Sequence, residues 1–200
     1  TVLNVQGCLV YKGFLDMDQQ RALLAQIRLV TQGAPLRRYE TRSGRKMSVA
    51  MSAAGDLGWI SDRQGYRYVT SDERGAWPDI PAPALEVWQA VSGVDVLADS
   101  CLVNFYGEGA RMGMHQDRDE AETGWPVVSI SLGDPALFRV GTASGKSPSK
   151  SVWLESGDAM VLRDDMRLAF HGIDRIKFGE SALLPKGGRL NLTLRRVAAA

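Results

Sequence analysis

Hydrophobic residues near the N-terminus of the chain repeat with the period of an α-helix. They stand three and four positions apart and would share one face: Leu23, Leu24, Ile27 and Val30. Asp16 precedes this stripe as a candidate N-cap, and Gln19 follows three residues later as its reciprocal partner. Gly33 is a typical helix end. The pattern therefore predicts a helix over residues 16–33, and a second helix is expected from about Pro83 to Val91.

The second half of the chain changes to short runs that favour β-strands. From Cys101 onward, β-prone segments are separated by Gly and Asp; they cover residues 102–106, 127–132, 137–140, 152–154, 159–162 and 189–197. Many short strands after N-terminal helices predict a mainly β protein with flanking helices (α+β). Its core would be a jelly-roll or a related two-sheet barrel.

The stretch from Arg37 to Ala76, between the two predicted helices, has poor periodicity and is rich in Arg, Gly, Ser and Tyr. We expect long loops with short hairpins there, forming a lid over a rigid core. The chain would then be a single domain over residues 1–200. Residues 1–36 and 80–100 would give helical support, 37–79 the lid and 101–200 the catalytic core.

The composition adds little about partners. The net charge is +1, so attraction to an anionic partner would have to come from a local patch. There is no run of 18 apolar residues and no signal peptide, so we expect no membrane partner and a cytoplasmic monomer. Cys8 and Cys101 belong to no pair motif and are expected to be buried thiols.

The chain has only two histidines, and both lie where a metal ligand would be useful. His115 and Asp117 are two residues apart, so on a strand or a turn both side chains lie on one side. His171 follows 54 residues after Asp117 (171 − 117) and would have to return on a later strand of the same sheet. Two imidazoles and one carboxylate can bind one face of iron(II) and leave positions open for a cosubstrate and dioxygen. Zinc that activates water remains an alternative at this point.

The predicted last strand has an unusual polar face. With a period of two, its three leucines form one face, and the other face carries Arg189, Asn191, Thr193 and Arg195. Either this face is solvated or it binds an anion. A guanidinium matches a carboxylate in a bidentate manner, which indicates a dicarboxylate such as 2-oxoglutarate inside the barrel. Asn104 and Tyr106 share a face of their own strand and could bind the same acid.

Several motifs together resemble the bacterial AlkB proteins, and the resemblance covers nearly the whole chain. The segments that carry it are Asn104-Phe105-Tyr106, the run from His115 to Glu120, His171-Gly172-Ile173, the run from Arg189 to Arg195, Val128 to Gly133, and Leu154 to Asp158. The family consists of dioxygenases that depend on Fe(II) and 2-oxoglutarate, consume O2 and repair alkylated bases. The resemblance implies a double-stranded β-helix under a nucleotide-recognition lid.

The resemblance also implies roles for individual residues. The iron ligands would be His115, Asp117 and His171, and the 2-oxoglutarate contacts would be Asn104, Tyr106, Arg189, Asn191 and Arg195. Trp59 and Tyr66 match aromatics near the flipped base, and Asp119 matches a carboxylate that reads the base. The chain departs from the family near Lys150, where bacterial relatives carry an arginine beside the substrate, and Lys150 is the candidate replacement.

The lid has its own features that suit nucleic acid. Five basic residues and one acid, Glu40, lie between positions 37 and 46; the basic residues are Arg37, Arg38, Arg42, Arg45 and Lys46. Arg42 and Arg45 could bind phosphates. Trp59 and Tyr66 could stack on a base, whereas we expect Tyr68 to pack in the core. For Asp119 the alternatives are a simple acidic surface run with Glu120 and Glu122, or a role in orienting a metal ligand.

The function expected is oxidative dealkylation of N-alkylated bases of the 1-methyladenine and 3-methylcytosine type. DNA is the expected substrate and RNA a second candidate. The reaction would release an aldehyde, succinate and CO2. Two alternatives stay open: a 2-oxoglutarate oxygenase that hydroxylates or demethylates a protein or small molecule, and a binding module with a structural metal. The first alternative should not need a basic, aromatic lid, and succinate formation in a single turnover would exclude the second.

Overall fold

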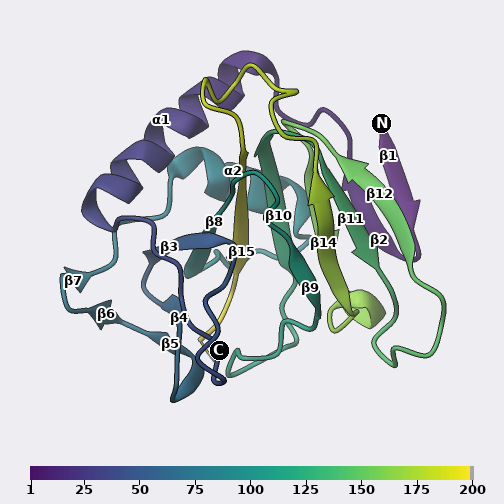
Figure 1. Cartoon of the computed structure of the whole chain (residues 1–200). Coiled ribbons are helices and arrows are strands. Elements are labelled where there is room, and N and C mark those ends of the chain that lie inside the picture. The colour runs from purple at the N-terminus through teal and green to yellow at the C-terminus, as the bar shows by residue number, and fades with distance from the viewer. Residues whose placement is uncertain (199–200) are drawn as a thin grey trace.

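The computed structural model describes residues 1–198 and shows two β-sheets packed face to face, with helices on the outside of one of them (Figure 1). The larger sheet has the order β1-β2-β13-β10-β15-β8-β3 and the smaller one β12-β11-β14-β9. The strands of the larger sheet are β1 (Val2–Val5), β2 (Cys8–Tyr11), β3 (Ala50–Gly55), β8 (Ser100–Tyr106), β10 (Val127–Gly133), β13 (Ala159–Leu162) and β15 (Arg189–Arg195). Those of the smaller sheet are β9 (Met112–His115), β11 (Ala136–Val140), β12 (Lys150–Leu154) and β14 (His171–Ile176). This is the expected double-stranded β-helix, mainly β with flanking helices.

Two helices, α1 (Met17–Gly33) and α2 (Ala82–Val91), cover the outer face of the seven-stranded sheet. The predicted capping box at the start of α1 is confirmed, because Asp16 accepts from the backbone of Gln19 and the Gln19 side chain accepts from the backbone of Asp16. The helical stripe of α1 and Trp88 of α2 are buried against the leucines of β15. This apolar layer fixes the back of the sheet whose front carries the site.

The predicted alternation of β15 is confirmed, and it separates two environments. Its leucines pack with the helices, whereas its polar residues line a cavity between the two sheets. All seven residues of β15 are buried, so the alternative of a solvated polar face is wrong. The strand pairs with β10 on one side and β8 on the other, with Arg189 opposite Tyr106 and Asn191 opposite Asn104.

Three strands of the large sheet lie outside the region where strands were expected. β1 and β2 form its N-terminal edge, and β3 pairs with β8 at the other edge. The expectation that residues 37–76 hold only loops and short hairpins is therefore wrong at residues 50–55. The sequence of β3 is Ala-Met-Ser-Ala-Ala-Gly, which has little β propensity. Its place in the sheet comes from close pairing of small side chains with β8, a tertiary effect.

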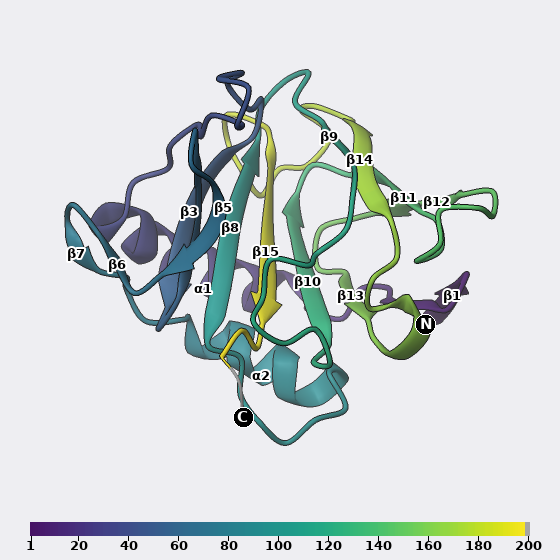
Figure 2. The same ribbon diagram turned by 90° about the horizontal axis from the view of Figure 1, so that it is seen from below.

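The expected hairpins do occur after that strand. β4 (Gly58–Asp62) pairs with β5 (Gly65–Val69), and β6 (Ser71–Asp72) pairs with β7 (Gly75–Ala76). The lid thus consists of two segments, residues 37–49 and 56–79, on either side of β3. Figure 2, seen from below, shows these segments beside β8 at the edge of the seven-stranded sheet. A short 3₁₀ turn, η1 (Asp164–Met166), precedes β14.

Two smaller expectations concern the cysteines and the membrane. Cys8 and Cys101 are free and fully buried, and burial raises the pKa of each thiol to about 12. Such thiols are poor nucleophiles at neutral pH. Among residues 1–198, no helix combines the length and the hydrophobicity that a membrane crossing requires.

Candidate metal and cosubstrate site

The small sheet brings the two histidines together. His115 ends β9 and His171 begins β14, and the two residues are directly opposite in the antiparallel pair. Their ring centroids are 4.6 Å apart. Gly172 permits this close pairing, because a Cβ there would lie 2.6 Å from the carbonyl oxygen of Met112. With Asp117, the three side chains offer ligand atoms that all lie within 4.8 Å of one another.

Backbone carbonyl groups fix the orientation of both imidazoles. Nδ1 of His115 lies 2.9 Å from the carbonyl oxygen of Gly113, and Nδ1 of His171 lies 2.9 Å from that of Ala169. Since a carbonyl oxygen only accepts, each Nδ1 carries the proton. Each Nε2 therefore presents a lone pair, and both are close to Asp117, at 3.6 Å and 3.7 Å from its carboxylate oxygens. Such a backbone contact is the usual means of orienting a metal-binding histidine.

The protonation states suit a divalent cation. Burial lowers the pKa of His171 below its ordinary value, which keeps that ring neutral at neutral pH. Burial by itself would raise the pKa of Asp117, but Arg195 and the two histidines hold it well below its usual range. The buried Oδ2 atom of Asp117 has no hydrogen-bond partner among the described residues. Burial by itself would lower the pKa of His115, but its contact with Asp117 raises it. A metal ion would take the place of that proton between His115 and Asp117, and two imidazoles with an ionised carboxylate fit the iron site predicted from the sequence.

A cavity of about 70 Å³ lies beside this cluster, between the two sheets. Arg189 reaches it from β15, is only 1% exposed and makes no ion pair within residues 1–198. Its Nε and Nη1 atoms have no hydrogen-bond partner there, and burial lowers its pKa to about 10. A buried guanidinium without a counter-ion is costly, and a carboxylate would compensate for it. The cavity therefore fits a small dicarboxylic acid.

The other predicted cosubstrate residues also line this cavity. The hydroxyl of Tyr106 lies 3.8 Å from Met112 Sδ, and its ring lies 5.9 Å from the Arg189 guanidinium carbon. Asn191 is held by its neighbours, because its amide oxygen accepts from Asn104 and Thr193 and its nitrogen donates to Ser129 at 2.5 Å. Asn191 thus fixes the side of the cavity, in addition to any contact with the cosubstrate.

Arg195 stands between the metal cluster and the cavity. Its Nη2 atom lies 3.1 Å from Oδ2 of Asp117. Burial by itself would lower the pKa of this guanidinium, but Asp117, Tyr68 and Glu120 raise it above the ordinary value. Arg195 therefore stays charged, balances the metal-binding carboxylate and remains at the cavity wall.

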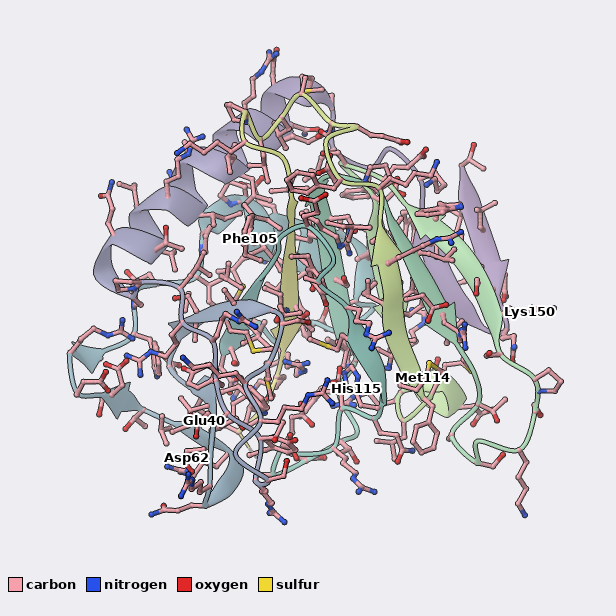
Figure 3. The ribbon with its side chains drawn as sticks, viewed as in Figure 1. Glu40, Asp62, Phe105, Met114, His115 and Lys150 are labelled. Atoms are coloured by element: carbon pink, nitrogen blue, oxygen red, sulfur yellow. The ribbon has the colours of Figure 1, made fainter. Side chains whose placement is uncertain are left out.

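A larger groove of about 1140 Å³ opens above the metal cluster. The lid contributes Arg42, Arg45, Trp59 and Tyr66 to its lining, as expected for all four residues. Both arginines are exposed, and Tyr66 is 42% exposed. Trp59 and Tyr66 stack on each other, with ring centroids 5.4 Å apart and 26° between the planes. Figure 3 shows Glu40 and Asp62, which mark the lid, on one side of His115 and Met114.

The acidic run after the metal motif divides into an exposed and a buried part. Asp119 is exposed and lines the groove, and its Oδ2 accepts the indole N–H of Trp59 at 3.1 Å. Glu120 is buried, so the alternative of a simple acidic surface run is wrong. The core packing expected for Tyr68 is also wrong. Tyr68 lines the groove and donates its hydroxyl to Glu120 at 2.8 Å, where burial first and the neighbouring carboxylates next raise its pKa.

Lys150 does not take the place of an arginine beside the substrate. It begins β12, the edge strand of the small sheet, is exposed, and lines neither the cavity nor the groove. In Figure 3 it lies at the opposite side of the molecule from the lid, well away from His115. Lys150 is therefore not the replacement for that arginine.

Sequence reasoning missed two charged residues of the site, Glu120 and Arg167. Arg167 is 4% exposed and lies between η1 and β14. Its Nη2 atom is 3.3 Å from Glu120, and it donates to the carbonyl oxygens of Asp117 and Trp125. No local pattern signals this role, because the partners of Arg167 lie 42 to 50 residues away in the chain.

This fold and this cluster define a mononuclear non-haem oxygenase that uses a 2-oxo acid. The sequence pattern of the 2OG-Fe(II) oxygenase superfamily matches residues 7–195, and the chain belongs to that superfamily, among its AlkB dioxygenases. The protein is accordingly a 2-oxoglutarate-dependent dioxygenase that uses Fe(II), 2-oxoglutarate and O2.

Individual relatives are similar over most of their length. The chain is 52% identical over 198 residues to the alpha-ketoglutarate-dependent dioxygenase AlkB homolog of Caulobacter vibrioides, covering 98% of this chain and 90% of that protein. It is 39% identical over 196 residues to the alpha-ketoglutarate-dependent dioxygenase AlkB of Escherichia coli, covering 95% and 90%. A shorter match, 43% over 109 residues, links 48% of this chain to 24% of a DNA N(6)-methyladenine demethylase of Arabidopsis thaliana. The solved structure of OsALKBH1 superposes with a TM-score of 0.81 at 30% identity, covering 98% of this chain and all of that one.

Proposed function

We propose that the protein oxidatively removes N-alkyl groups from bases of DNA, with RNA as a second substrate class. The overall reaction consumes O2 and 2-oxoglutarate, and it yields the restored base, an aldehyde, succinate and CO2. Alkylated bases of the 1-methyladenine and 3-methylcytosine type are the expected substrates. The expected oligomeric state is a monomer, and the expected compartment is the cytoplasm.

The metal would be held by His115, Asp117 and His171. When bound, iron(II) supplies the activation of dioxygen that is coupled to decarboxylation of the 2-oxo acid. The carbonyl groups of Gly113 and Ala169 keep the imidazole lone pairs directed at the shared centre. Arg195 keeps Asp117 ionised and in place.

The cosubstrate would lie in the cavity between the sheets, with one carboxylate toward Arg189. Each charge-assisted hydrogen bond of this kind contributes about 1.5–3 kcal/mol net. Tyr106 closes the same end of the cavity, and Asn104 and Asn191 line its side. The apolar residues Leu154, Leu162 and Phe138 exclude water from the remaining wall. The residues proposed to contact the acid, Asn104, Tyr106, Arg189, Asn191 and Arg195, all lie on the paired strands β8 and β15.

The nucleic acid would lie in the groove under the lid. Arg42 and Arg45 would contact phosphates, which contributes affinity without reading sequence. A damaged base must leave its stack to reach the metal, and a weakened pair costs less to open. Trp59 and Tyr66 present aromatic faces in the groove, where stacking contributes about 1–3 kcal/mol per base. Asp119 would accept a hydrogen bond from the exocyclic amino group of cytosine or adenine.

One observation carries the proposal: the groove above the metal cluster is lined by cations and an aromatic pair from the same lid. A pocket for a small molecule would not need phosphate-binding groups at its rim. The DNA N(6)-methyladenine demethylase of Arabidopsis thaliana, which shares part of its length with this chain, supports the same substrate class.

The direct test is formaldehyde release from an oligonucleotide that contains one 3-methylcytosine. We expect release only when Fe(II) and 2-oxoglutarate are both present, with one succinate formed for each formaldehyde. Activity that survives the omission of either component would contradict the mechanism. Succinate formation that is not stimulated by the oligonucleotide would instead favour a protein or small-molecule substrate.

A further inference from the structure

Glu120 occupies an unexpected position for an acidic residue. It lies in the exposed loop after β9, between the exposed Asp119 and the exposed Glu122, yet its own side chain is only 1% accessible. Burial of a carboxylate is unfavourable unless other groups compensate its charge. The position of Glu120 must therefore be explained by its partners.

Three partners surround Glu120, and each comes from a different part of the molecule. Tyr68 of β5 in the lid donates its hydroxyl to Oε1 at 2.8 Å. Arg195 of β15 lies 3.1 Å from the same oxygen, and Arg167 lies 3.3 Å from Oε2. Neither guanidinium contact has hydrogen-bond geometry, since Glu120 Oε2, Arg167 Nη2 and Arg195 Nε all remain without a hydrogen-bond partner among the described residues. The one directed bond to Glu120 within residues 1–198 is thus the bond from the lid.

Arg167 also fixes the loop that carries Glu120. Its Nη1 atom donates to the carbonyl oxygen of Asp117 at 2.6 Å, and its Nε atom donates to that of Trp125 at 2.5 Å. The guanidinium therefore holds both ends of the segment from 117 to 125. The backbone of Glu120 therefore cannot move easily when the lid moves. If Tyr68 is displaced, it is the side chain of Glu120 that must change its position.

Arg195 connects Glu120 to the reaction centre. Besides Glu120, it lies 3.1 Å from Oδ2 of Asp117, and it lines the cosubstrate cavity. The charges of the two carboxylates and the two guanidinium groups sum to zero, and the metal that Asp117 would bind adds its own positive charge on that side. If the attraction between Glu120 and Arg195 becomes stronger, the attraction of Arg195 for Asp117 and for an anion in the cavity must therefore become weaker.

We propose that Glu120 is a positioning residue that couples the lid, through Tyr68, to Arg195 and the cosubstrate cavity. The coupling rests on the proposed function, because the lid is where the nucleic acid would bind. With the lid in place, Tyr68 shares the negative charge of Glu120, and Arg195 keeps its contacts with Asp117 and with a cosubstrate carboxylate. With the lid withdrawn, Glu120 draws Arg195 toward itself and weakens the hold on that carboxylate.

Coupling of this kind is reciprocal, so nucleic acid and 2-oxoglutarate should each strengthen the binding of the other. The test measures binding of 2-oxoglutarate by calorimetry in the Mn(II)-loaded protein, which does not turn over. Titrations are made with and without a saturating oligonucleotide that contains 3-methylcytosine. In the parent protein the Kd for 2-oxoglutarate should fall about fivefold or more when the oligonucleotide is present. We call the Kd without the oligonucleotide divided by the Kd with it the coupling ratio. In Tyr68→Phe this ratio should approach one, with weak binding of 2-oxoglutarate in both titrations.

A second variant distinguishes coupling from general damage. Glu120→Gln removes the charge that competes for Arg195, so its ratio should also approach one, but with tight binding of 2-oxoglutarate in both cases. Loosened packing would weaken the binding of 2-oxoglutarate in both variants. It would not make binding weak in Tyr68→Phe and tight in Glu120→Gln while the coupling is lost in both. In turnover, Tyr68→Phe should raise the KM for 2-oxoglutarate more than it lowers kcat, and Glu120→Asp should partly restore the parent ratio.

Tyr39→Phe is the matched control. It also removes a lid hydroxyl from a buried tyrosine that packs edge-on against Trp59, but no hydrogen bond of this hydroxyl occurs among the described residues. It should keep the parent ratio. A parent ratio of one, or an unchanged ratio in Tyr68→Phe, overturns the coupling while leaving the proposed function intact. A parent protein that does not bind the oligonucleotide overturns both.

Discussion

The arginines of the cavity and the arginines of the lid face anions under opposite physical conditions. Arg189 and Arg195 are 1% and 6% exposed and are held on a strand that is buried on both faces. Arg42 and Arg45 are exposed and belong to a turn-rich segment of the lid. The same side chain can thus serve a small, fixed acid in one region and a long, flexible polyanion in the other.

The difference shows what burial does to charge recognition. In the cavity, water and salt cannot screen the guanidinium, so removing one charged group has a large effect on binding. Burial of the guanidinium also lowers the stability of the free protein, because the charge loses its hydration. On the lid, each interaction is weak and is screened by salt, and affinity comes from the sum of several interactions.

The largest loss of activity is expected when a residue of the metal cluster is changed, because the buried region has this cluster and the lid does not. His171→Ala and Asp117→Ala should each lower formaldehyde release by more than about 100-fold, since changing even an outer partner of a metal ligand typically costs about 10–100-fold. Binding of Mn(II), followed by electron paramagnetic resonance, should weaken in parallel. Retention of a tenth of the parent activity in either variant would contradict the assignment of these residues as ligands.

Arg189→Met is expected to separate function from stability. The KM for 2-oxoglutarate should rise about 10-fold to 100-fold, which corresponds to the loss of about 1.5–3 kcal/mol of charged hydrogen bonding. The metal-free protein should become more stable, by about 1–4 kcal/mol, because a buried charge without a partner is replaced by an apolar side chain. Thermal denaturation without metal or cosubstrate checks the second part. A lower melting temperature would show that Arg189 is compensated in the free protein.

The lid arginines should give smaller, additive and salt-dependent effects. Substitution of both Arg42 and Arg45 by Ala should weaken oligonucleotide binding several-fold and leave the KM for 2-oxoglutarate unchanged. On a single strand, the slope of log K against log salt should fall by about 0.7 for each phosphate that is no longer neutralised. Arg28→Ala, which removes an exposed arginine from α1, is the control and should leave the slope unchanged. Equal slopes in the parent and the double variant would exclude phosphate binding by this pair.

The smallest effect is expected at Lys150, which belongs to neither region. Lys150→Ala should keep formaldehyde release within about twofold of the parent, as is usual for an exposed substitution away from the site. Single-turnover rates with 1-methyladenine and 3-methylcytosine oligonucleotides provide the measurement. A lower single-turnover rate on only one of these two bases would show that Lys150 acts at the substrate site.

The sequence predicted the parts of the molecule in which local pattern and tertiary structure agree. The alternation of leucines and polar residues from Arg189 to Arg195 identified both faces of β15, and the capping residues located the start of α1. The metal cluster could be predicted because histidine is rare in this chain and because ligands two residues apart can reach one centre. Asp117 lies in the loop after β9, so it is a turn and not the strand that brings it beside His115.

The remaining features depend on which segments meet in three dimensions. β3 has small side chains with little strand preference, and only its pairing with β8 makes it a strand. Glu120 belongs to a run whose composition is typical of a solvated loop, and its burial follows from Arg167 and Arg195, which lie 47 and 75 residues away (167 − 120; 195 − 120). Tyr68 was assigned to the core because local patterns do not show which face of a hairpin lies over a groove.

The position of β3 in the middle of the lid makes the two lid segments neighbours. Residues 50–55 are hydrogen-bonded to β8, so the segments before and after them leave from the same edge of the sheet. The two segments also contact each other, because Ser61 donates to the carbonyl oxygen of Glu40 at 2.6 Å and the rings of Tyr39 and Trp59 pack edge-on at 6.0 Å. A change in length before β3 should therefore also shift the aromatic residues after it, so affinity for the polymer and choice of the damaged base are expected to evolve together.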